Sequence, residues 1–99
     1  MSVYKSKFGL IKEGNLILYK PMSEPIAIIT IVDIKMSKQN LIPNYFLNYF
    51  KRNEYDFIIM LDNQKQIKFS FREKKLTSAT EFKKRILHMK FSLQDTISQ

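Results

Sequence analysis

The sequence has no cysteine and no tryptophan, and it contains only two glycines, three prolines and one histidine. Without cysteine, disulfide bonds and thiolate metal sites are excluded. The isolated Gly9 and Gly14 cannot form a glycine-rich phosphate loop. His88, the single histidine, has no second histidine as a metal partner and is expected on the solvent side of a helix among lysines and arginines. We therefore expect a protein that is not an enzyme and that binds neither metal nor cofactor.

Long hydrophobic runs are also missing. The longest apolar stretch, residues 26–32, is far shorter than the roughly 18 residues that a membrane-spanning helix needs. No apolar segment follows the lysines near the N-terminus, so we expect no secretory signal. Together with the lack of cysteine, this predicts a cytoplasmic protein, with a peripheral position at a membrane as a compatible alternative.

Positive charge is in clear excess, since 17 Lys and Arg residues face 9 Asp and Glu residues and give a net charge of +8. A balance of this kind favours anionic partners, such as nucleic acid or an acidic membrane surface. The chain is equally rich in Lys, Asn and Ile, which an AT-rich genome would also produce. The sequence leaves open whether the charge is functional or compositional.

The first half of the chain is typical of β-strands. Residues 6–11 and 16–19 are predicted strands joined by a tight turn at 13–15, where glycine and asparagine tolerate positive φ. Residues 21–25 form a proline-containing loop. The next segment, 26–34, is almost continuously β-branched and apolar on both faces, which predicts one long strand that is central or bent.

Residues 36–54 are the least regular part of the sequence. Their aromatic side chains are spaced as in a helix, although a short strand is an alternative, and we favour a short helix or an irregular excursion. Apolar residues in such a segment either cover the core or contact a partner. The candidates for partner contact here are Tyr45, Phe46, Tyr49 and Phe50.

The second half predicts a hairpin followed by one helix. In residues 55–61 every second side chain is apolar and expected to face inward, and residues 66–71 alternate between polar and apolar side chains after a turn at 62–65. The pattern Ser78-Ala-Thr-Glu81 matches a capping box and predicts a helix over 78–91, followed by a polar tail over 92–99. One apolar stripe recurs at helical spacing and should face the core: Ala79, Phe82, Ile86, Met89 and Leu93.

This order resembles the pleckstrin-homology-like domains and the related GRAM domains. The resemblance rests on Gly14-Asn-Leu-Ile-Leu-Tyr-Lys20, on the following strand with its Asp33-Ile34 step, and on the late hairpin and helix. It covers roughly residues 8–91. Phe82 stands where the family's helix usually carries a tryptophan, and the first hairpin is short. The resemblance implies a mainly β fold, a bent antiparallel barrel or sandwich closed by one C-terminal helix. A chain of 99 residues is too short for two independent cores, so we expect a single domain of residues 1–99 whose core spans about 3–91.

Basic residues near the N-terminus and in the segment 72–90 are the candidates for anion binding. A solvated helix face would explain the second group, and an electrostatic patch for phosphates or acidic headgroups is the functional interpretation. The candidate residues are Lys5, Lys7, Lys12, Lys20, Lys74, Lys75, Lys83 and Lys84.

Leu87 and Phe91 lie four residues apart and outside the core stripe of the helix, so we expect them to contact a partner or a second copy of the chain. Alternatively, Phe91 covers the end of the barrel. The sequence therefore predicts a non-enzymatic binding or adaptor module for a protein partner, with self-association included. The alternatives are binding of anionic membranes or phosphoinositide headgroups, and binding of nucleic acid through the cluster 72–90.

Overall fold

The computed structural model describes residues 3–21, 24–39 and 53–98. The aromatic segment with Tyr45, Phe46, Tyr49 and Phe50 lies outside these residues, so its predicted structure and its role in partner contact stay predictions. At its borders, residues 36–38 and Glu54 belong to β-strands rather than to a helix or an irregular excursion.

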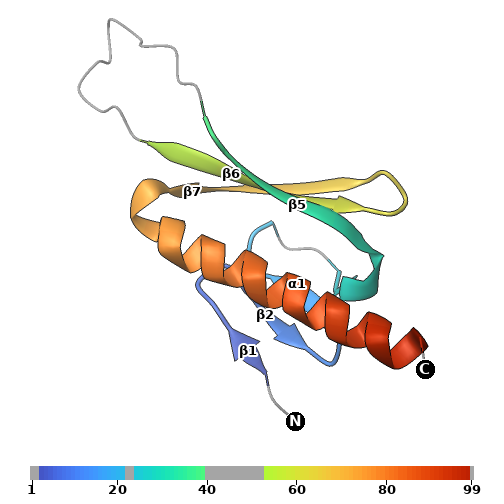
Figure 1. Ribbon diagram of the computed structural model, residues 1–99. Helices are drawn as coiled ribbons and strands as arrows, with labels where there is room; N and C mark the ends of the chain where they lie inside the picture. Colours follow the sequence, from blue (N-terminus) through green and yellow to red (C-terminus); the bar gives the residue numbers. More distant parts are fainter. Residues whose placement is uncertain (1–2, 22–23, 40–52, 99) are drawn as a thin grey trace, which may run out of the picture.

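The described residues form two antiparallel sheets and one C-terminal helix (Figure 1). The first sheet has the order β1-β2-β3-β4: β1 (Tyr4–Lys5), β2 (Gly9–Lys12), β3 (Asn15–Leu18) and β4 (Ile26–Ala27). The second sheet has the order β5-β6-β7, followed by the helix: β5 (Ile31–Lys38), β6 (Glu54–Leu61), β7 (Gln66–Arg72) and α1 (Leu76–Ser98). The prediction of a mainly β protein with one C-terminal helix is confirmed.

The turn between β2 and β3 forms where the sequence predicts it. Glu13 and Gly14 have φ values of 52° and 78°, which suit a two-residue hairpin turn. The strand predicted at 6–11 begins only at Gly9, because the Ser6 hydroxyl accepts hydrogen bonds from the backbone N–H groups of Phe8 and Gly9 and turns the chain. A Cβ atom on Gly9 would lie 2.3 Å from the carbonyl oxygen of Ile17, so the close approach of β2 and β3 requires glycine here.

The prediction of one continuous strand over 26–34 is wrong. A 3₁₀ turn, η1 (Ile28–Thr30), interrupts it, so that β4 ends in the first sheet and β5 begins in the second. The Thr30 hydroxyl donates to the carbonyl oxygen of Ala27 and closes this turn. The expectation of a bend is confirmed, because the apolar run forms the corner between the sheets. Val32 and Ile34 would share one face of a regular strand, but Val32 is 60% exposed and Ile34 is 1% exposed.

The hairpin of β6 and β7 forms where the sequence predicts it. Its inward-facing pairs are Tyr55 with Phe71, Phe57 with Phe69, and Ile59 with Ile67. The aromatic members of these pairs stack, with ring centroids 5.6 Å apart for Tyr55 and Phe71 and 4.7 Å apart for Phe57 and Phe69. Cross-strand aromatic pairs stabilise a hairpin beyond the area they bury.

The helix is longer than predicted at both ends. The chain leaves β7 through a 3₁₀ turn, η2 (Glu73–Lys75), and enters α1 at Leu76, so Ser78 lies inside the helix and cannot act as its N-cap. The residues predicted as a polar tail continue the helix to Ser98. No helix in the described part of the chain is long and apolar enough to cross a membrane.

The core lies where α1 meets both sheets. The helix stripe is confirmed: Ala79, Phe82 and Ile86 are fully buried, and Met89 and Leu93 pack against them. The ring centroid of Phe82 lies 5.8 Å from that of Phe8, which precedes β2, and 5.7 Å from that of Phe57 in β6. One helical side chain therefore connects the two sheets.

Candidate anion-binding cleft

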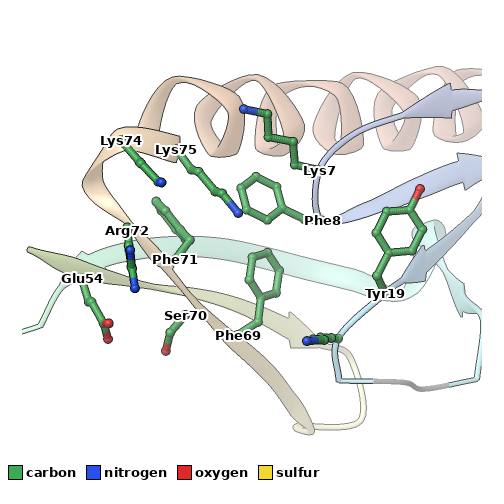
Figure 2. Close-up of a pocket in the computed structure, with 11 residues that line it drawn as sticks. Lys7, Phe8, Tyr19, Glu54, Phe69, Ser70, Phe71, Arg72, Lys74 and Lys75 are labelled. Carbon is green, nitrogen blue, oxygen red and sulfur yellow. The ribbon is translucent and has the colours of Figure 1, made fainter. Parts of the chain in front are cut away.

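A cleft of about 500 Å³ opens between β7, the η2 turn and two segments of the N-terminal half of the chain (Figure 2). Its size falls within the range of small-ligand sites, about 300–1,000 Å³. The cleft residues are Lys7, Phe8, Tyr19, Lys20, Glu54, Phe69, Ser70, Phe71, Arg72, Lys74 and Lys75.

Positive charge dominates this cleft. Glu54 is the only anion among the residues that line it. Five of the lining residues are cations: Lys7, Lys20, Arg72, Lys74 and Lys75. Within the described part of the chain, the one ion pair joins Arg85 and Glu81 on the helix, so no cleft cation forms an ion pair with a carboxylate. A hollow lined by charges of one sign focuses the electrostatic field and concentrates ions of the opposite sign. The arrangement can therefore hold an anionic group.

The cleft has an aromatic floor. Phe8 stacks on Phe69 at a centroid distance of 5.3 Å and packs against Phe71 at 5.7 Å. Figure 2 shows these rings between β7 and the segment that carries Lys7 and Phe8. Because the rings belong to the packed core, the floor is preorganised. Tyr19, which is 45% exposed, adds an accessible ring to the lining.

The cleft brings together basic residues that are far apart in the sequence. Of the predicted anion-binding residues, Lys7 and Lys20 come from the first half of the chain, and Lys74 and Lys75 come from η2. Arg72 joins them; it belongs to the predicted basic segment 72–90 but was not among the eight residues singled out for anion binding. Its outward position at the end of the predicted strand 66–71, next to other basic residues, was the signal that could have identified it.

The other predicted lysines do not line this cleft. Lys5 borders a second hollow of about 430 Å³ beside the start of α1. Lys12 ends β2 and Lys84 lies on α1, and both are exposed. Lys83 is a partly buried residue of the same helix.

Leu87 and Phe91 have different environments. Leu87 is half-buried and packs against the core, so the prediction that it lies apart from the core contacts is wrong. The physical reason is that α1 packs against two sheets, which covers more of its circumference than a single stripe. Phe91 is 60% exposed, and its role as a partner contact stays a prediction.

His88 is exposed on α1, as predicted. Among the described residues, no three His, Asp or Glu side chains are grouped so that they could hold a metal ion.

A polar network crosses the second sheet next to the cleft. One carboxylate oxygen of Asp56 accepts hydrogen bonds from the Gln39 amide at 2.7 Å and from the Ser70 hydroxyl at 2.9 Å. These bonds, with the Gln39 bond as the largest cause and a smaller contribution from the charge of Lys68, hold the pKa of Asp56 below its ordinary value of 3.8. The network fixes the Ser70 side chain at the border of the cleft.

This network predicts a pH dependence of stability. Because the pKa of Asp56 is lower in the folded protein than in the unfolded chain, its contribution is complete well above pH 3.8 and is lost as the pH falls through the lowered folded value. Asp56→Asn should therefore reduce the loss of unfolding free energy on acidification. Urea unfolding of both proteins between pH 6 and pH 3 measures the difference. Parallel curves for the two proteins would contradict the assignment.

Comparisons of the chain with protein-family models, with curated proteins and with solved structures found no match.

Proposed function

We propose that this protein is a non-enzymatic binding module that recognises a negatively charged part of a protein partner in the cleft between β7 and the first sheet. The observation that carries the proposal is that five cations, none of them in an ion pair among the described residues, line one cleft over a preorganised aromatic floor. Placing like charges together costs free energy, and an anionic ligand relieves that cost.

We also propose that the domain is of the pleckstrin-homology-like kind, a bent barrel or sandwich, and that it acts in the cytoplasm. The fold interpretation is supported by the order of the elements, four strands in one antiparallel sheet, three in a second, and one helix at the end. It is also supported by the corner at η1, where the chain passes directly from one sheet to the other.

A peptide partner suits the cleft better than the two alternatives. Of the four lysines expected to bind a lipid headgroup together, Lys7 and Lys20 line the cleft, whereas Lys5 and Lys12 lie outside it. Single-stranded nucleic acid needs accessible rings on which bases stack. Phe8 and Phe71 are 8% and 5% exposed, so Tyr19 is the main accessible ring in the cleft. A partner that offers both carboxylates and apolar groups matches the lining.

The proposal predicts binding of an acidic peptide that weakens as salt screens the charges, by roughly tenfold or more between 50 and 300 mM NaCl. A labelled glutamate-rich peptide, phosphatidylserine vesicles and a single-stranded oligonucleotide serve as probes in parallel titrations. NMR should show the peptide shifting the signals of Lys7, Lys20, Lys74 and Lys75, which line the cleft. Shifts spread evenly over all lysines, or tighter binding of the vesicles or the oligonucleotide, would overturn the proposal.

A further inference from the structure

The strand beside the cleft, β7, is the outer strand of the second sheet. Hydrogen bonds at its two ends show which residues face β6. The N–H of Leu61 donates to the carbonyl oxygen of Lys65, and the N–H of Glu73 donates to the carbonyl oxygen of Asn53, both at 2.9 Å. The register between these ends runs without a bulge.

Because hydrogen-bonded positions alternate along an antiparallel strand pair, these two ends determine toward which side of β7 each residue between them directs its backbone groups. Hydrogen-bonded positions recur at every second residue, so residues 67, 69 and 71 bond to β6 as residues 65 and 73 do. The even-numbered residues direct their backbone N–H and C=O groups to the opposite, open side of β7. These are Gln66, Lys68, Ser70 and Arg72.

This open edge and the cleft coincide. Ser70 and Arg72, whose backbone groups face the open side, also line the cleft. Among the described residues, no strand pairs with this side of β7. An open edge can accept another strand, and proteins often protect such edges with charged side chains. Here the charges on the strand, Lys68 and Arg72, are of one sign, so they repel a basic segment and attract an acidic one.

We propose that the partner segment recognised in the cleft is an extended peptide with alternating acidic and apolar residues, which adds to β7 as an antiparallel fourth strand. This inference rests on the function proposed above and specifies its ligand. Successive side chains of a strand point to opposite faces. The apolar set would lie on the side of Phe69 and Phe71, and the acidic set on the side of Lys68 and Arg72, which alternate with those rings along β7.

The backbone groups favour a peptide over a compact anion. A phosphate or a single carboxylate can satisfy the cleft cations, but it leaves the row of backbone donors and acceptors along residues 66–72 unpaired. An added strand pairs these groups and places its acidic side chains beside Lys68 and Arg72. Backbone hydrogen bonds give such complexes their affinity, and the alternating side chains give them their specificity.

Amide hydrogen exchange tests the inference with the unmodified protein. In the free protein, the amides of Lys68, Ser70 and Arg72 should exchange faster than those of the intervening residues 67, 69 and 71, which bond to β6. The probe is a blocked peptide of four Glu-Val repeats. Its binding should slow the exchange of the three edge amides by roughly tenfold or more, because each becomes hydrogen-bonded. Unchanged exchange at these amides with saturating peptide would overturn the inference.

Two N-methylated versions of the probe provide a matched control. In an antiparallel addition, the peptide residues that bond to Ser70 and Arg72 share their outward side, so they are the glutamates. Methylating two central glutamate nitrogens removes two hydrogen bonds and should weaken binding roughly thirtyfold. Methylating two central valine nitrogens leaves these bonds intact and should change the affinity less than about threefold. Equal effects of the two versions would contradict strand addition.

Inorganic pyrophosphate is the probe that distinguishes a failure of strand addition from a failure of anion binding in the cleft. If pyrophosphate shifts the NMR signals of the cleft lysines while the peptide leaves the edge amides unprotected, the cleft is an anion site and strand addition is wrong. If neither probe shifts those signals, both proposals fall. Protection of the edge amides by the peptide, with shifts at Lys7, Lys74 and Lys75, supports both.

Discussion

Replacing Phe82 by alanine should lower the free energy of unfolding by about 3–5 kcal/mol, the usual cost of deleting a buried aromatic ring. The Phe82 side chain is fully buried, and its ring packs against Phe8 on one side and Phe57 on the other. The substitution therefore removes the contact through which α1 holds both sheets together. A small domain has only about 5–15 kcal/mol of stability in total, so this loss would bring the protein close to unfolding.

Phe91→Ala is the matched control, since it makes the same exchange on the same helix. Phe91 is 60% exposed, so its removal should change the free energy of unfolding by no more than about 0.5 kcal/mol. Urea unfolding followed by circular dichroism measures both variants. Similar losses for the two variants would show that the helix does not bury its predicted stripe.

The burial of Phe82 could be predicted because its signal is local. The 3,4-residue spacing of apolar side chains in α1 and the alternation of polar and apolar side chains in β7 each identify a buried face without knowledge of the rest of the chain. The same reasoning predicted the turn at Glu13 and Gly14, where the backbone needs positive φ. These elements determine the fold class, which is why the sequence was sufficient for it.

The corner at η1 could not be predicted in this way. Residues 28–30 are Ile-Ile-Thr, which favour a strand, and nothing nearby in the sequence marks a 3₁₀ turn. The turn forms because the chain must pass between two sheets, which is a tertiary requirement. The start of α1 was missed for a related reason: the chain enters the helix directly from η2, so the capping pattern at Ser78 is not used.

The cleft was predictable only in part. Its lysines are recognisable as basic residues, but Lys7 and Lys12 are equivalent in the sequence, and only the fold places one of them in the cleft. The open edge of β7 likewise cannot be predicted until the order of the strands in the sheet is known. Leu87 shows the same limit, because a helical wheel assumes one contact face and α1 has two neighbouring sheets. Local sequence patterns identify the residue types that can form the site, but the packing of the two sheets determines which individual residues line it.

Charge reversal at Lys7, Lys74 and Lys75 should abolish most of the binding of the acidic peptide, weakening it roughly 30- to 100-fold. These three side chains come from two segments that meet at the cleft. Replacing them by glutamate removes the attraction for carboxylates and adds repulsion next to Arg72. The fold should survive, because none of the three belongs to the buried core. Fluorescence titration at low salt measures the affinity, and circular dichroism checks the fold.

The control is the triple variant Lys12→Glu, Lys35→Glu and Lys84→Glu, whose positions are exposed and lie outside the cleft. Both triple variants carry the same net charge, because each replaces three positive charges by negative ones. General electrostatic attraction should therefore fall equally in both, by a few-fold at moderate salt. The additional loss in the cleft variant measures local recognition. Equal affinities of the two variants would mean that the overall charge of the protein, and not the cleft, attracts the peptide.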